Sequence, residues 1–176
     1  MTYDDYKELE MLDPYYKGRW HYYKMVVDLL QRLSFDTCLE LGPYKKPMVQ
    51  GADVIDKDRH LGDLTYEHDA NLIPWPVRDG QYDLFIALQV WEHLERKREA
   101  FEEVRRIAKM AVLSFPLNWY CPGNLHHGIT EEKIAEWTNQ TKPTLKFVVR
   151  GWNVSLKGIL KKSFCIKRLI CLYDFR

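Results

Sequence analysis

Polar and acidic residues follow four apolar runs of the sequence, each in a short motif. The motifs are Glu40-Leu41-Gly42-Pro43-Tyr44, Asp56, His68-Asp69-Ala70 and Gln89-Val90-Trp91-Glu92-His93. A carboxylate such as Asp56 can accept hydrogen bonds from two vicinal hydroxyls, as on a ribose, and Asp69 can accept one from the exocyclic amine of an adenine. Gly42 has no Cβ, so its backbone can approach a ligand closely. A single strand-end aspartate is more often a turn or cap residue, so the order of the motifs carries this prediction.

Three histidines are candidates for a catalytic base: His93, His126 and His127. Their ordinary pKa of about 6.5 suits proton abstraction close to neutral pH. Each has a structural alternative, because His93 can hydrogen-bond at a helix start and one of the adjacent pair can simply be exposed. Adjacent side chains seldom converge on one ion, no His-Glu-x-x-His spacing occurs and the cysteines are scattered, so we expect no metal site.

Short apolar runs predict the strands that would position these residues. The strongest runs lie at 37–41, 53–56 and 82–90; further candidates lie at 110–115, 145–152 and 165–175, with a weaker one at 65–69. Runs of this length are too short for typical helices and are typical of buried strands. Seven strands are therefore expected.

Apolar residues at three- and four-residue steps predict helices around the strands. We expect a short helix that ends at Asp13-Pro14, helices over 20–33 and 91–109, and a helix capped by Thr130. The alternation predicts an α/β fold with a Rossmann-like, doubly wound, seven-stranded and mostly parallel sheet, in which ligands bind at the carboxyl ends of the strands. The tyrosine-rich N-terminal helices are a candidate lid, and Trp75 is a candidate wall residue or a core residue.

The chain has 176 residues, 29% of them charged, and a net charge of +1. This is typical of one globular domain, excludes a disordered acidic chain and gives no overall electrostatic reason for nucleic-acid binding. Residues 141–176 hold nine basic and one acidic side chain, which could attract an anionic substrate or form a solvated basic face. No apolar run is long enough to span a membrane and the N-terminus is too acidic for a signal peptide, so we expect a cytoplasmic protein.

The region from Thr37 to Pro116 resembles the class I S-adenosylmethionine-dependent methyltransferases, particularly the small ones that act on metabolites. The similar stretches are CLELGPYKKP, DVIDKD, HDANLIPWPVRDGQYDLFIALQVWEHL and AFEEVRRIAKMAVLSFP, in the order of the family. The resemblance implies S-adenosylmethionine as the cofactor and S-adenosylhomocysteine as the product. It also implies one methyltransferase domain over 1–176, with an N-terminal helical segment at 1–33, a cofactor-binding half at 34–116 and an acceptor-side half at 117–176.

The resemblance assigns the cofactor contacts position by position. Glu40 and Gly42, with Pro43 and Tyr44 in the same loop, are expected beside the methionine part of the cofactor. Asp56 matches the ribose ligand, with Asp58 as the near alternative. The adenine side is expected at Asp69 and Ala70, and Gln89 is expected near the methionyl group and the sulfonium.

Two departures from the family pattern stand in the loop after the first strand. The second glycine of the family is Tyr44 here, so its ring must turn outward or close over the cofactor. Only residues 43–52 separate the first two strands, which predicts that the usual crossover helix is reduced to a loop or a single turn. With no G-x-G-x-x-G motif and no intact helix start, a pyrophosphate would lack its usual site, whereas S-adenosylmethionine carries no phosphate.

The leading functional hypothesis is methyl transfer by direct displacement to a small-molecule acceptor, such as a sugar or another hydroxylated metabolite. A non-catalytic module that binds S-adenosylmethionine or a nucleotide is one alternative. A nucleic-acid or protein methyltransferase is another; against it stand the near-neutral charge and the absence of an N-P-P-(Y/F) turn at Gln89. The sequence makes no prediction of the oligomeric state.

Overall fold

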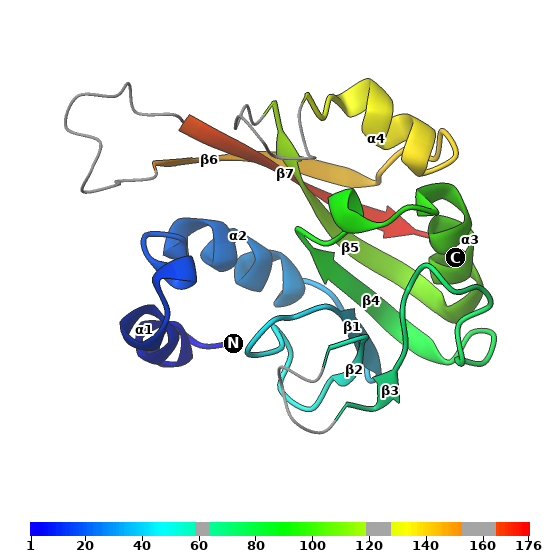
Figure 1. Ribbon diagram of the computed structural model, residues 1–176, viewed down its shortest axis with the longest axis horizontal. Coiled ribbons are helices and arrows are strands. Elements are labelled where there is room, and N and C mark those ends of the chain that lie inside the picture. Colours follow the sequence, from blue (N-terminus) through cyan, green and yellow to red (C-terminus); the bar gives the residue numbers. More distant parts are fainter. Residues whose placement is uncertain (59–63, 119–127, 153–164) are drawn as a thin grey trace.

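The computed structural model describes residues 1–58, 64–118, 128–152 and 165–176, and in these ranges the chain forms one seven-stranded sheet (Figure 1). The strand order is β3-β2-β1-β4-β5-β7-β6. The strands are β1 Cys38–Leu41, β2 Asp53–Asp56, β3 Tyr66–Glu67, β4 Tyr82–Leu88, β5 Ala108–Leu117, β6 Leu145–Trp152 and β7 Cys165–Asp174. Strand β7 runs antiparallel to both of its neighbours, β5 and β6, and the other strand pairs of this sheet are parallel. The Rossmann-like, mostly parallel sheet predicted from the apolar runs is therefore confirmed.

Helices cover both faces of the sheet, with α2 on one side and α3 and α4 on the other (Figure 1). The helical elements are α1 Tyr3–Leu12, η1 Pro14–Tyr16, α2 Trp20–Leu30, η2 Trp91–His93, α3 Lys97–Ile107 and α4 Glu131–Trp137. The predicted cap is present, since Thr130 Oγ1 accepts a hydrogen bond from Lys133 N at 3.3 Å. None of the helices in the described ranges has the length and apolar character of a membrane span.

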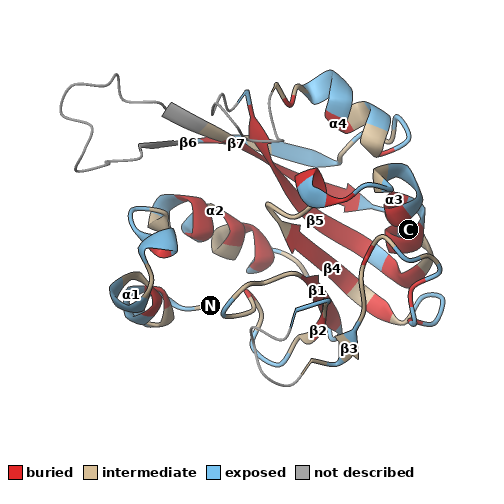
Figure 2. Cartoon of the chain, viewed as in Figure 1, coloured by how far each residue is buried: buried red, intermediate tan, exposed pale blue. Residues whose placement is uncertain are grey.

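The central strands are buried on both faces, which explains their nearly continuous apolar runs (Figure 2). Alternate residues of β4 enter two separate cores: Leu84 and Ile86 pack with α2, whereas Phe85 packs with α3. Helix α2 contributes Val26, which is fully buried, and two leucines to its core. Since α2 covers a face of the sheet, it is part of the core rather than a lid.

The helix expected over 91–109 is shorter than predicted, because α3 begins at Lys97. Residues Trp91–His93 form a separate 3-10 turn, and Leu94 is extended with ψ of 149°. The side chain of Asn71 explains the break: its Oδ1 accepts hydrogen bonds from Glu95 N at 2.7 Å and Arg96 N at 3.4 Å. These amides are therefore bonded to a distant loop instead of to the preceding turn.

The connection between β1 and β2 contains no helix, as its length predicted. Residues 42–52 run through turns and bends, and Ala52 N donates to Val49 O just before β2 begins. The carboxyl end of β1 is therefore left open to the space above the sheet instead of facing a helix N-terminus.

Candidate active site

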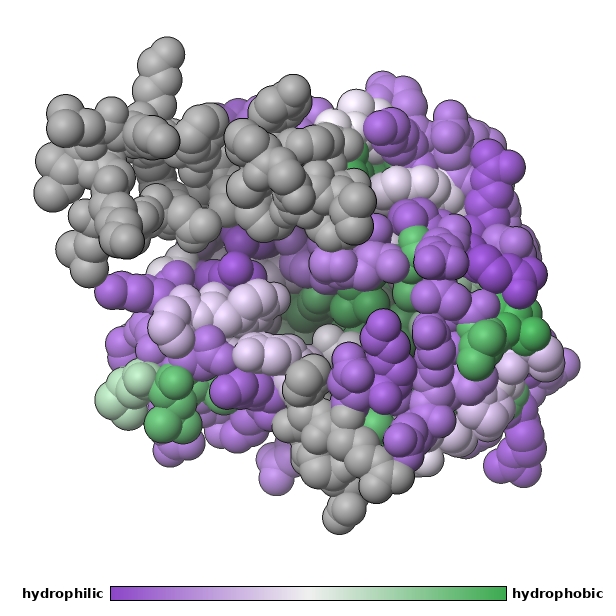
Figure 3. Space-filling model, in the orientation of Figure 1, coloured by the Kyte–Doolittle hydropathy of each residue, from purple (hydrophilic) through white to green (hydrophobic). Residues whose placement is uncertain are grey.

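A cleft of about 410 Å³ lies where the carboxyl ends of β1, β2 and β4 meet. This volume is in the range of small-molecule sites. Figure 3 shows apolar side chains set in a hollow near the centre of one face, with hydrophilic side chains around it. The cleft is lined by Tyr15, Gly42, Tyr44, Asp56, Asp58, Leu88, Gln89, Val90 and His93. These residues come from η1, from the last residues of β2 and β4, and from the segments that follow the three strands.

A smaller cavity of about 20 Å³ adjoins the cleft and contains Glu40 in its wall. The Glu40 side chain is only 2% exposed, and its Oε2 accepts a hydrogen bond from Met48 N at 2.7 Å. Burial raises the pKa of Glu40 to about 8, because the charged form is poorly solvated there. Glu40 is therefore mostly protonated at pH 7 in this state of the protein.

Gly42 and Tyr44 bring the loop after β1 against the end of β4. Both have a φ of 61°, in the left-handed region that favours glycine. A Cβ on Gly42 would lie 3.1 Å from Cγ2 of Val90, so the loop approaches Val90 closely. The Tyr44 hydroxyl donates to Asp13 Oδ2 at 3.0 Å, and its ring centroid lies 5.2 Å from that of Tyr15. The Tyr44 ring thus packs on the N-terminal segment and forms part of the cleft wall.

Of the acidic residues predicted to hold a ligand, the structure brings Asp56 and Asp58 to the cleft wall. Asp56 Oδ1 also accepts a hydrogen bond from Asp58 N at 3.1 Å. Asp69 is not among the residues that line the cleft; its Oδ1 accepts from Asn71 N at 2.9 Å and Asn71 Nδ2 at 3.0 Å. Ala70, the neighbour of Asp69, is buried and likewise does not line the cleft.

Gln89 follows β4 in a fixed conformation with a φ of 59°. Its backbone N donates to Ser114 O at 3.2 Å, and its side-chain Nε2 lies 3.2 Å from Ser114 Oγ. Ser114 is the register partner of Leu88, the last residue of β4. The last pair of the β4–β5 ladder therefore holds Gln89 at the cleft.

Of the three candidate bases, His93 alone lies within the described residues. His93 lines the cleft, and its backbone N donates to Val90 O at 2.9 Å. His126 and His127 lie outside the described residues. Trp75 is 2% exposed and its ring stacks on Phe85 with centroids 5.7 Å apart, so it is a core residue and not a cleft wall.

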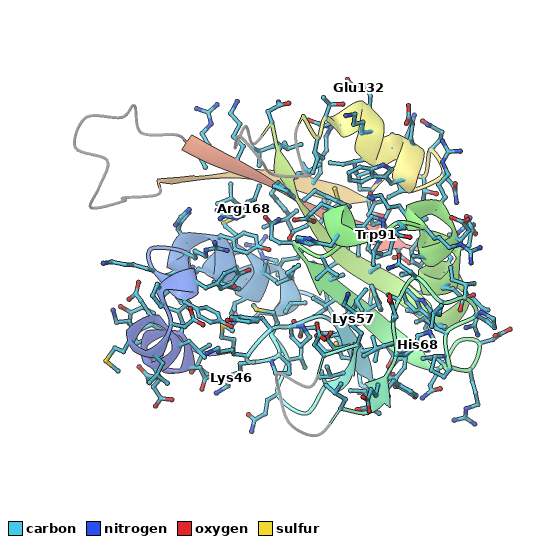
Figure 4. The ribbon with its side chains drawn as sticks, viewed as in Figure 1. Lys46, Lys57, His68, Trp91, Glu132 and Arg168 are labelled. Atoms are coloured by element: carbon cyan, nitrogen blue, oxygen red, sulfur yellow. The ribbon has the colours of Figure 1, made fainter. Side chains whose placement is uncertain are left out.

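Three buried polar atoms have no hydrogen-bond partner within the described ranges: Trp91 Nε1, Glu92 Oε2 and Arg168 Nε. Burial raises the pKa of Glu92 to about 7. Figure 4 shows Arg168 between β7 and α2, and Trp91 at η2. Arg168 was not predicted as a site residue, although it lies two and four residues before Ile170 and Leu172 and therefore on the face of β7 that packs with α2.

A family model described as a methyltransferase domain matches residues 44–111. The match includes Asp56, Asp69, Gln89 and His93, and it begins two residues after Gly42. No curated protein sequence matches the chain.

Solved structures of methyltransferases share the fold. One is a possible histamine N-methyltransferase from Thermotoga maritima, with a TM-score of 0.64, 9% identity and 97% of each chain covered. Another is the N-methyltransferase NodS from Bradyrhizobium japonicum in complex with S-adenosylhomocysteine, with a TM-score of 0.63, 14% identity, and 90% of this chain and 87% of that chain covered. A third, from Haloferax volcanii, is a putative methyltransferase in complex with a methyltransferase activator, with a TM-score of 0.61, 12% identity, and 96% of this chain and 94% of that chain covered.

Proposed function

We propose that this chain is a class I S-adenosylmethionine-dependent methyltransferase and that it methylates a small hydroxylated molecule by direct displacement. The observation that supports the proposal is the cleft of about 410 Å³, where Gly42, Asp56 and Gln89 come together from the ends of three strands. Parallel α/β sheets bind their ligands at this edge.

The chemistry of the cleft fits S-adenosylmethionine. The carboxylates of Asp56 and Asp58 on its wall can accept hydrogen bonds from the ribose hydroxyls. The loop after β1 contains no helix, so it offers no helix N-terminus to bind a phosphate. S-adenosylmethionine carries no phosphate and does not need such a site. Gly42 allows close approach of the cofactor to the backbone beside Val90.

We assign the remaining contacts from the resemblance and from these positions. Glu40 and the loop residues Pro43 and Tyr44 lie next to the proposed methionine site, because they line the smaller cavity that adjoins the cleft. Gln89 faces the proposed methyl-donor end. Asp69 and Ala70 are the proposed adenine contacts, beyond the part of the cleft that Asp56 lines.

When bound, the cofactor supplies a methyl group that is already activated by the sulfonium. The protein then has to hold the acceptor oxygen in line with the C–S bond, at about 3–3.5 Å, and to exclude water. The rings of Tyr15 and Tyr44 on the cleft wall can exclude water and attract a positively charged sulfonium.

A hydroxyl acceptor also has to lose a proton, and we propose His93, His126 or His127 as the base. The position of His93 on the cleft wall supports its candidacy. Replacement of the base should slow turnover more than it weakens cofactor binding. Comparing His93→Gln with the double variant His126→Asn/His127→Asn, in turnover and in S-adenosylhomocysteine affinity, would identify it; equal losses in both measurements would assign a histidine to folding or to the cofactor site.

The proposed function is tested by binding and by product formation. Titration calorimetry should show binding of S-adenosylhomocysteine, and tight binding of NADH without it would overturn the proposal. The release of S-adenosylhomocysteine is then measured with sugars and other hydroxylated small molecules, and in parallel with RNA and protein substrates. Turnover of the small molecules supports the proposed acceptor class, whereas methylation of RNA or protein alone overturns it.

A further inference from the structure

Arg168 lies near the carboxyl end of β5, on the side of the sheet where the cleft is found. In β7 it is the register partner of Pro116, one residue before the end of β5, and of Val149 in β6. Its neighbours two and four residues along the strand, Ile170 and Leu172, pack in the core that contains α2. The Arg168 side chain therefore points to the α2 side, at the carboxyl end of β5 (Figure 4).

Arg168 is buried, and no counter-charge accompanies it among the residues that the structure describes. Its side chain is 4% exposed, Nε has no hydrogen-bond partner, and no carboxylate of the described residues forms an ion pair with it. The guanidinium carbon lies 5.1 Å from the centroid of the Tyr22 ring, which offsets only part of the loss of hydration. A buried charge that lacks a partner costs free energy, and an arginine stays protonated at any physiological pH.

The charges around Arg168 do not neutralise it. Burial and the positive charge of Arg19 lower its pKa. Arg168 also interacts with the buried carboxyl of Glu92, whose pKa burial raises to about 7, so that Glu92 is only partly ionised at neutral pH. Tyr15, Tyr22, Tyr23 and His21 also interact electrostatically with Arg168.

Short contacts connect Arg168 to the cleft. Tyr22, under the Arg168 guanidinium, has its hydroxyl 2.5 Å from Ser114 Oγ, and Ser114 holds Gln89 on the cleft wall. On the other side, the Arg19 guanidinium lies 3.8 Å from the centroid of the Tyr15 ring, which also lines the cleft. Neither guanidinium lines the cleft itself, but each contacts a tyrosine ring that is connected to the cleft wall, Arg168 through Tyr22 and Arg19 through Tyr15.

We propose that Arg168, assisted by Arg19, binds an anionic group of the acceptor, so that the preferred substrates are hydroxylated molecules that carry a carboxylate or a phosphate. This inference rests on the proposed function and narrows its substrate class. Guanidinium groups bind such oxyanions through paired, charge-assisted hydrogen bonds, and an anion would supply the partner that buried Arg168 lacks. Neutral hydroxylated molecules would leave the charge unpaired and bind more weakly.

The first test uses stability and the simplest anions. Arg168→Met replaces a buried, unpaired charge with an apolar chain, so its Tm without added anion should be at least that of the wild type. Inorganic phosphate or acetate, compared with chloride at equal ionic strength, should raise the Tm of the wild type and not that of Arg168→Met. Arg150→Met, which removes an exposed arginine of β6, is the matched control and should keep the anion effect. No anion effect in the wild type, or the same effect in Arg168→Met, would overturn the inference.

The second test compares acceptors in matched pairs: hydroxy acids with their methyl esters, and sugar phosphates with the free sugars. For the pair that is turned over, the wild type should favour the anionic member by about tenfold or more in kcat/KM. Which of the two pairs is preferred shows whether the anionic group is a carboxylate or a phosphate. In Arg168→Met the ratio of kcat/KM between the anionic and the neutral member should fall to about one, mainly through KM, with unchanged affinity for S-adenosylhomocysteine. Arg168→Lys should retain part of the preference for the anionic member.

Equal turnover of both members by the wild type overturns this inference and leaves the proposed function intact. Failure of S-adenosylhomocysteine to bind would instead overturn the proposed function. If S-adenosylhomocysteine binds but neither member of any pair is methylated, the anion effect on Tm in the first test decides whether the inference about Arg168 stands.

Discussion

The hydroxyl oxygens of Tyr22 and Ser114 lie 2.5 Å apart and join helix α2 to strand β5 beneath the cleft. Ser114 Oγ also lies 3.1 Å from Gln89 N and 3.2 Å from Gln89 Nε2. One serine therefore holds both the tyrosine under Arg168 and the glutamine at the proposed methyl-donor end. The two proposed halves of the site, for cofactor and for acceptor, share this buried contact.

Replacement of Ser114 by alanine should destabilise the protein by about 1–3 kcal/mol, because the fully buried Tyr22 hydroxyl would lose its partner. Chemical denaturation with urea measures the change in the free energy of unfolding. Tyr22→Phe removes the other side of the same contact, so the double variant should be less destabilised than the sum of the two single variants. Strict additivity would show that the contact contributes nothing to stability.

Gly42→Ala should cost more stability than Gly80→Ala, and the two form a matched pair. Both glycines have a φ close to 60°, at 61° and 62°, so an alanine is strained by roughly 1 kcal/mol at either position. A Cβ at Gly80 meets nothing within 4 Å, whereas at Gly42 it lies 3.1 Å from Val90. The excess loss at Gly42, measured by urea denaturation, therefore reports the contact between the loop after β1 and the end of β4.

The same pair separates stability from binding. Gly42 lines the cleft and Gly80 does not, so only Gly42→Ala should weaken the binding of S-adenosylhomocysteine in calorimetry. Equal affinity in the two variants would argue that the cofactor does not approach the backbone at Gly42.

Stability should fall as the pH rises from 7 to 8, because of Glu40. Its folded-state pKa of about 8 lies above its ordinary value of 4.5, so the native state binds a proton that the unfolded state has already lost. The stabilisation is complete below about pH 4.5 and is lost through pH 8, at up to about 1.4 kcal/mol per pH unit. Glu92, whose pKa is about 7, adds to the fall at lower pH. His21 acts in the opposite direction, since its lowered pKa costs stability as the pH falls below 6.5.

Glu40→Gln isolates this effect, because its amide oxygen can still accept the hydrogen bond from Met48 N. Unfolding free energies at pH 7, 7.5 and 8 should decline in the wild type and decline less steeply in the variant, in which Glu92 still contributes. Parallel curves for the two proteins would contradict the raised pKa of Glu40.

The sequence predicted the strands well, because β4 and β5 are buried on both faces and their apolar runs are nearly unbroken. It misplaced the start of α3, because the amides of Glu95 and Arg96 bond to Asn71, a residue more than twenty positions earlier. No local pattern of the sequence reports such a tertiary contact. In the same way, the contact of Tyr22 with Ser114 joins residues 92 positions apart.

The candidate site was predictable only where position on a strand determines it. Asp56 and Gln89 lie at the cleft because each follows a parallel strand, and the carboxyl ends of these strands meet. Asp69 has the same residue type in a similar position, but it does not line the cleft. A sequence does not distinguish an aspartate that binds a ligand from one that closes a turn.

Asp56→Ala should weaken the binding of S-adenosylhomocysteine by about tenfold to a hundredfold, the loss of one or two charge-assisted hydrogen bonds to the ribose. Asp69→Ala should have a smaller effect, because Asp69 does not line the cleft. Asp58→Ala is the informative comparison, since Asp58 lines the same wall within two residues of Asp56. Calorimetric titration of the three variants would assign the ribose contact to Asp58 if that variant alone lost affinity. Unchanged binding in both Asp56→Ala and Asp58→Ala would place the ribose outside this cleft, and the assignment of Gln89 to the methyl-donor end would fail with it.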